Sequence, residues 1–274
     1  MQVNKVNFLR WSDALEDPGL PEPPYAYWRQ RNMCILKPIF LPGETNAFYI
    51  NNPSGFIYPN FQDLRLQLIN MENTIVSDGF AELQQHFLPE FAAENRYNIW
   101  ADYVIPFIAN EGDYKLSIIV GATGVVLLTS NIVKVRKDQS RLYDTTTFCR
   151  FRHDRFFYNI RYHDVPIFYQ KFRLPISKLE EQISGTTEIH KQATTGRSII
   201  LESIEDKEVK FESYWFDNEA HDAAAAMVKH RFLELNNKLY SFKADYKRDP
   251  TLMGKLSKGQ FEVYDEEYAS INRC

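Results

Sequence analysis

The chain has 274 residues, of which 44% are hydrophobic, 15% aromatic and 25% charged, enough to bury a sizeable core and to favour two domains over a disordered tail. The net charge of −4 argues against a general nucleic-acid binder, because phosphate binding depends on clustered Lys and Arg. Three distant cysteines, Cys34, Cys149 and Cys274, fit neither a disulfide framework nor a zinc knuckle. The sequence also has no apolar run of the kind that a signal peptide or membrane anchor needs, so we expect neither.

Residues 1–31 are predicted to form an extended, proline-rich arm. Four prolines lie between Pro18 and Pro24, where they fix φ and remove backbone donors. The arm carries large aromatic side chains that need a surface to rest on, either on this chain or on a neighbouring subunit. These candidate interface residues are Trp11, Tyr25, Tyr27 and Trp28.

Residues 32–137 are predicted to form an Ig-like β-sandwich. In "DLRLQLIN" and "DYKLSIIV" apolar residues alternate with polar ones, as in half-buried strands, and turn signals such as Pro42-Gly43 separate further strand-like runs. One insertion departs from this pattern. Between residues 77 and 95, the residues Phe80, Leu83, Phe87 and Phe91 follow helical spacing, which predicts a short helix interrupted at Pro89.

The stretch "RFRHDRFFYNIRYHDVPIFYQKFRLP", residues 150–175, is predicted to be a β-hairpin that turns at residues 163–166. His153 and His163 would then lie some 30 Å apart along an extended strand, too far to share a metal ion. We therefore expect no metal site and no cofactor. From this hairpin we take four further candidate interface residues, Phe157, Arg161, Tyr169 and Arg173.

Basic residues interleave with aromatics just before this hairpin. Residues 134–155 contain seven Lys or Arg against three Asp, a local balance of +4. A nucleic-acid contact and a solvated strand face beside a subunit interface both fit this pattern; the acidic chain as a whole favours the second.

Residues 138–274 are predicted to form an α+β assembly domain with an antiparallel sheet and one main helix. After the hairpin we expect a polar loop in "ISGTTEIHKQATTG" and two strands around Glu205-Asp206-Lys207. Asp217 is predicted to cap a helix whose apolar stripe runs from Ala225 to Leu235 and which Asn236-Asn237 ends. The predicted fold class is thus mainly β with an α+β second half.

Two segments resemble known virion proteins. "GDYKLSIIVGATGVVLLTSNIVKV" resembles the closing strands of Ig-like modules in structural proteins of phages that infect Bacteroidetes. The order of "GRSIILESIEDKEVKFESYWFD", helix, Asn-Asn turn and "KLYSF" is similar to tail, neck and ring components of crAss-like and related tailed phages. The resemblance carries over no active-site residue.

This resemblance implies a structural virion protein, a neck or tail ring subunit that assembles in the host bacterial cytoplasm. Its implied partners are other copies of itself in a ring-like homo-oligomer and other virion proteins such as the portal and adjacent ring or tail proteins, with transient contact to packaged DNA also conceivable. The alternatives are a carbohydrate-binding adhesin or fibre-attachment protein and an unrecognised hydrolase. We expect no enzyme, because the sequence has no phosphate-binding loop, nucleophile elbow or convergent carboxylates.

Overall fold

Strands dominate the computed structural model, which contains a single helix among the residues it describes. These are residues 2–3, 8–9, 11–13, 37–51, 64–87, 97–107, 109–121, 123–137, 145–157, 160–162, 165, 168–191, 194, 198–253, 256–268 and 270–273. The predicted mainly β class is confirmed, with one large mixed sheet in which most pairs are antiparallel and β11 (Val133–Val135) pairs with β3 (Ile39–Phe40) in parallel.

The first half of the chain forms strands where hydrophobic alternation predicts them. Leu66 and Leu68 are fully buried on one strand, and Leu116 and Ile118 face them from its partner, since the two strands pair residue for residue. The strands are β3 (Ile39–Phe40), β4 (Thr45–Asn51), β5 (Leu64–Asn70), β6 (Ile75–Glu82), β7 (Gln84–Phe87), β8 (Tyr97–Val104), β9 (Gly112–Val120), β10 (Val125–Ser130) and β11 (Val133–Val135).

The helix predicted within residues 77–95 is wrong over its described part. Residues 75–82 form β6, which pairs with β5, and residues 84–87 form β7, which pairs with β8. The apolar residues there fit a 3.6-residue period, but pairing to two existing strands satisfies their backbone groups as a helix would. Residues 88–96 lie outside the described part of the chain.

The second half builds its sheet around the strand pair β12–β15. The strands are β12 (Thr147–Arg152), β13 (Phe156–Phe157), β14 (Ile160–Arg161), β15 (Gln170–Leu174), β16 (Ile176–Lys191), β17 (Ser198–Phe216), β18 (Phe232–Leu235), β19 (Lys238–Phe242), β20 (Lys247–Met253), β21 (Leu256–Asp265) and β22 (Ser270–Arg273). The predicted hairpin is wrong in its pairing. Residues 170–174 (β15) pair with residues 147–151 of β12, and residues 156–157 and 160–161, which were expected to form one strand opposite them, pair with each other as β13 and β14.

The helix α3 (Asn218–Met227) begins as predicted and ends early. The side chain of Asp217 accepts a hydrogen bond from the backbone N–H of Ala220 at 2.7 Å, so the predicted N-cap is confirmed. Residues 232–235 belong to strand β18 instead of the helix, with Leu233 and Leu235 buried on one face. Asn236 and Asn237 have φ of 51° and 64° and make the turn between β18 and β19.

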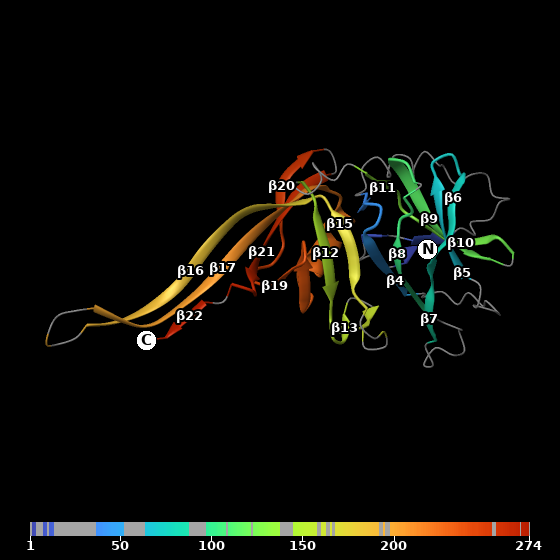
Figure 1. Ribbon diagram of the computed structural model, residues 1–274. Coiled ribbons are helices and arrows are strands. Elements are labelled where there is room, and N and C mark those ends of the chain that lie inside the picture. Colours follow the sequence, from blue (N-terminus) through green and yellow to red (C-terminus); the bar gives the residue numbers. More distant parts are fainter. Residues whose placement is uncertain are drawn as a thin grey trace.

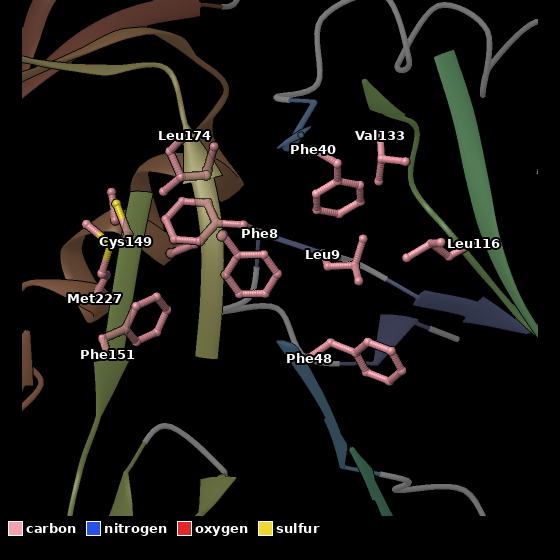
Figure 2. Packing of buried hydrophobic residues seen from close by; sticks show 14 of the residues in the cluster. Phe8, Leu9, Phe40, Phe48, Leu116, Val133, Cys149, Phe151, Leu174 and Met227 are labelled. Carbon is pink, nitrogen blue, oxygen red and sulfur yellow. The ribbon is translucent and has the colours of Figure 1, made fainter. Parts of the chain in front are cut away.

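The N-terminal residues enter the core. Strand β1 (Gln2–Val3) pairs with β2 (Trp11–Asp13), and β2 pairs with β10. Figure 2 shows Phe8 and Leu9 between two groups of apolar side chains, with Phe151 and Leu174 on one side and Phe40, Phe48 and Leu116 on the other. One hydrophobic cluster therefore runs through both halves of the chain.

The predicted boundary between residues 137 and 138 lies between β11 and β12. Strand pairing crosses it, because β15 pairs with β3 at Ile39 and with β4 at Ala47. A smaller aromatic cluster also crosses it, with Tyr49 packed against Phe168 at a ring separation of 5.9 Å. The two halves thus share both sheet and core.

Candidate assembly interface

A long β-hairpin, β16 and β17, projects from the rest of the molecule (Figure 1). The two strands pair from Ile176 opposite Ser213 to Lys191 opposite Ser198. On its other edge, β17 pairs with β21 near the body and with β22 farther out. We call this hairpin, residues 176–216, the projecting arm. Along most of its length the projecting arm is therefore a three-stranded antiparallel sheet.

One edge of the projecting arm has no partner among the described strands, because β16 pairs with β17 alone. A bulge interrupts the β16–β17 ladder at Leu179, and a second irregularity falls between Glu188 and Ile189. Residues 180–188 between them are an uninterrupted run of edge strand. Unpaired N–H and C=O groups on such an edge can pair with a strand of another chain.

Apolar side chains on the projecting arm are exposed to solvent. Leu179 is 50% exposed, Ile183 56%, Ile189 57% and Tyr214 63%. Three of the four lie on β16, the strand with the unpaired edge. A single exposed apolar residue needs no explanation, but several along one free edge indicate a contact surface.

Ion pairs across the arm hold its strands together. Glu181 contacts Lys178 and lies 2.8 Å from Lys207, and hydrogen bonds from these two ammonium groups lower the pKa of Glu181. Glu208 pairs with Lys243, which directly follows β19, and accepts a hydrogen bond from Ser184. Both hydrogen bonds lower the pKa of Glu208. Each exposed pair contributes little by itself, but together they favour one alignment of the strands.

A groove of about 390 Å³ lies where the projecting arm joins the body. Burial raises the pKa of Tyr240 to about 12, and Asp265, which pairs with Lys238 at 2.5 Å, adds to the shift. Polar and apolar residues both line the groove, and its lining contains no nucleophile paired with a base. It is lined by Thr146, Thr147, Ile176, Ser177, Lys178, Phe211, Leu235, Asn236, Lys238 and Tyr240.

Among the candidate interface residues predicted in residues 1–31, the structure describes the surroundings of Trp11. Trp11 does not lie at an exposed interface. Its side chain is 1% exposed and packs on Phe48 at a ring separation of 4.9 Å. The prediction for Trp11 is corrected because strand pairing with β10 carries the indole into the chain's own core. Tyr25, Tyr27 and Trp28 lie outside the described residues.

The hairpin candidates are also spread over different environments. Phe157 stacks on His153 at 4.5 Å and packs edge-on against His230 at 4.8 Å. Tyr169 is covered by the guanidinium group of Arg150, 4.0 Å from its ring centre. For Arg161 the structure gives the backbone position in β14, opposite Phe156. Phe157 and Tyr169 thus make contacts with different residues.

Arg173 is not an exposed contact residue, which corrects its assignment as an interface candidate. Its side chain is 2% exposed and makes two hydrogen bonds to Glu44, with Nε at 3.0 Å from Oε2 and Nη2 at 2.6 Å from Oε1. Nη1 also donates to Thr146 Oγ1 at 3.2 Å. A buried charge needs such hydrogen-bonded partners. Arg173 was predicted to lie at an interface because it is charged, but its guanidinium group instead joins β15 to the residues that precede β4 and β12.

Two histidines lie in buried hydrogen-bond networks that sequence reasoning missed. His221 Nε2 lies 2.8 Å from Ser257 Oγ, and its Nδ1 lies 2.6 Å from the Tyr246 hydroxyl. A serine beside a histidine is the pairing found in hydrolases. Here Ser257 is fully buried and its Oγ also accepts from Arg248 at 2.7 Å, so this contact belongs to the packing of α3 against β21.

His230 lies in the second network. Its Nδ1 donates to the carbonyl of Ala226 at 2.8 Å, so Nε2 accepts from Tyr162 at 2.8 Å, and Tyr162 in turn accepts from Gln170 at 2.9 Å. Burial lowers the pKa of His230 to about 4. His163 lies outside the described residues, and within the described ones no group of three or more His, Cys, Asp or Glu could hold a metal ion.

The projecting arm was itself not predicted. "ISGTTEIHK" was interpreted as a polar loop and is part of β16, while Glu205-Asp206-Lys207, expected as a turn, lies within the 19-residue strand β17. The apolar residues Ile183 and Ile189 of this part of β16 are exposed, so hydrophobic alternation does not mark a buried face there. The available signal was the β-branched content of the segment, namely its Ile and Thr residues.

No family model matches this chain, and no curated protein matches it either. Among the residues that the structure describes, no helix has the length and apolar character to cross a membrane.

Proposed function

We propose that this chain is a structural subunit of a tailed-phage virion, a neck or tail ring component that assembles through its N-terminal arm and its sheet edges. The observation that carries this proposal is the projecting arm, with a 16-residue strand that is paired on one side and has three exposed apolar residues. An edge of this length favours association, because pairing satisfies its backbone groups and removes the apolar residues from water.

The charge pattern supports an ordered contact surface. The cross-strand ion pairs of Glu181 and Glu208 favour a defined geometry in the projecting arm before any partner binds. Pre-organised surfaces lose less conformational freedom on association. The similarity of the second half to neck and ring components, and of residues 112–135 to an Ig-like module, supports a virion as the setting.

In this proposal the partners are further copies of this chain and other virion proteins, with the portal and adjacent ring or tail proteins as neighbours. Contact with packaged DNA would be transient, because two basic residues of β12 and β15 already have acidic partners: Arg150 pairs with Glu234 at 3.0 Å and Lys171 with Asp102 at 2.5 Å. The role is non-enzymatic.

The test is self-association of the purified chain, measured by light scattering and by cryo-EM class averages. We expect a closed oligomer with rotational symmetry. Ile183→Asp together with Leu179→Asp should reduce association without lowering the thermal midpoint, since both residues are exposed. Ile75→Asp, at a position 54% exposed on β6, is the matched control and should associate normally. The proposal would be contradicted if the purified chain stayed monomeric at all concentrations and was also not assembled in the virion.

A further inference from the structure

The described residues near the N-terminus, 2–3, 8–9 and 11–13, occupy a slot in the body, and we call them the N-terminal segment. Its strand β2 pairs with β10 over three positions, Trp11 opposite Ser130, Ser12 opposite Thr129 and Asp13 opposite Leu128. The side-chain amide of Asn131 donates to the carbonyl of Phe8 at 3.3 Å. The described contacts of this segment with the body thus include pairing to β10 and a hydrogen bond from Asn131, which follows β10.

Three apolar side chains fix the N-terminal segment in this slot. Phe8, Leu9 and Trp11 are each no more than 1% exposed. Phe8 meets Phe172 of β15 at a ring separation of 6.0 Å, whereas Trp11 meets Phe48 of β4 at 4.9 Å. Figure 2 shows Phe8 and Leu9 at the seam between the two halves of the core. The slot therefore matches the shape of these three side chains.

A long stretch of sequence separates the N-terminal segment from the body that receives it. Residues 14–36 number 23 and include Pro18, Pro21, Pro23 and Pro24. A stretch of this length can span at most roughly 76 to 83 Å, whereas a folded protein of the length of the whole chain has a radius of gyration of roughly 19 Å. Its length allows the segment to reach the slot of a neighbouring copy as well as its own.

We propose that in the assembled protein the slot of each copy receives the N-terminal segment of a second copy of this chain. The contacts of Phe8, Leu9 and Trp11 are the same in either arrangement, so exchange costs no core packing. In an oligomer the neighbour's segment is held at high local concentration, and exchange links adjacent subunits through buried residues. This inference rests on the proposed function, because it requires an oligomer.

The test uses one cysteine on each of two distinguishable chains. One chain carries Ser12→Cys and the other Thr129→Cys, both in a background with Cys34→Ser and Cys274→Ser. The buried Cys149 is kept, because burial raises the pKa of its thiol and keeps it protonated. Opposite residues of antiparallel strands have Cα atoms about 4.5 to 5.5 Å apart, within the range of a disulfide. The two chains are tagged to differ in mass, co-expressed and oxidised.

Exchange predicts a disulfide-linked species containing both chains in the oligomeric fraction, lost on reduction. Pairing the Ser12→Cys chain with a Thr123→Cys chain is the control and should give none, because Thr123 is exposed in the β9–β10 turn. A single chain carrying both Ser12→Cys and Thr129→Cys shows whether the disulfide can form. If that chain closes the bond internally and the oligomer shows no link between chains, the exchange is wrong and the proposed function stands. If every sample is monomeric, both are wrong.

Discussion

Glu44 and Arg173 form a buried, two-point ion pair that joins the two halves of the chain. Glu44 precedes β4, Arg173 lies in β15, and their nearest atoms are 2.6 Å apart. The pair lies close to where β15 pairs with β3 and β4, so it holds the strand register at the same place as the backbone does.

Removing one member of this pair should destabilise the protein strongly. Arg173→Met leaves Glu44 without its cation in a partly buried site, and we expect the free energy of unfolding to fall by about 3 to 5 kcal/mol. The double variant Arg173→Met/Glu44→Leu should recover much of that loss, since it removes both charges. Urea unfolding of Arg173→Met, Glu44→Leu and the double variant measures the coupling energy between the two side chains. If the losses of the two single variants simply add in the double variant, the two side chains are not coupled.

Truncating Trp11 should also destabilise the fold. Trp11→Ala opens a cavity in the core beside Phe48, and the expected loss is about 3 to 5 kcal/mol. Tyr214→Ala is the matched aromatic control, because Tyr214 is exposed on the projecting arm. It should change the free energy of unfolding by less than about 0.5 kcal/mol. Thermal unfolding measures both. Equal midpoints for Trp11→Ala and the unchanged chain would show that the indole is not in the core.

Stability should fall as pH drops below neutrality, and His230 should account for a large part of the fall. Burial lowers the folded-state pKa of His230 from 6.5 to about 4, so the unfolded state binds more protons between these values. The neutral form is present in both states above about pH 6.5, and the loss grows to about 3 kcal/mol near pH 4. Burial lowers the pKa of His221 too, which adds a loss in the same direction.

Urea midpoints at pH 7.5 and pH 4.5 test this expectation. His230→Gln should be less stable than the unchanged chain at pH 7.5, because it disturbs the contact to Tyr162, but its midpoint should drop less between the two pH values. Val125→Gln, at an exposed position on β10, is the control and should keep the full pH dependence. An equal drop in all three proteins would assign the effect to other groups.

Gly259 should not tolerate a side chain. A Cβ at this position would overlap the Tyr246 hydroxyl, which is fixed by His221 at 2.6 Å and Ser213 at 3.3 Å. We expect Gly259→Ala to destabilise the protein by about 1 to 3 kcal/mol. Gly112→Ala, also in a strand, is the control, because its Cβ would make an ordinary 3.6 Å contact with Tyr114. Thermal midpoints that shift equally would contradict this account.

Local sequence determined the strands with one buried face and the start of the helix. Alternation in residues 64–70 and 112–120 locates β5 and β9, because the apolar residues Leu66, Leu68, Leu116 and Ile118 recur at every second position and lie in the core. The polar residues Gln67 and Ser117 between them are buried as well, which the alternation does not predict. Asp217 marks the start of α3 because its side chain satisfies a free N–H group of the first turn. Each of these signals acts within a few residues, so the sequence alone suffices to find it.

Only the tertiary structure decided where Trp11 and Arg173 lie and how far the projecting arm extends. Trp11 is buried by contact with β10, more than a hundred residues away, and Arg173 by pairing with Glu44. Residues 77–87 became strands because β5 and β8 supplied partners, and β16 extends as a strand because β17 pairs with it over its whole length. In each case the stabilising partner is distant in sequence, so the local pattern could not identify it.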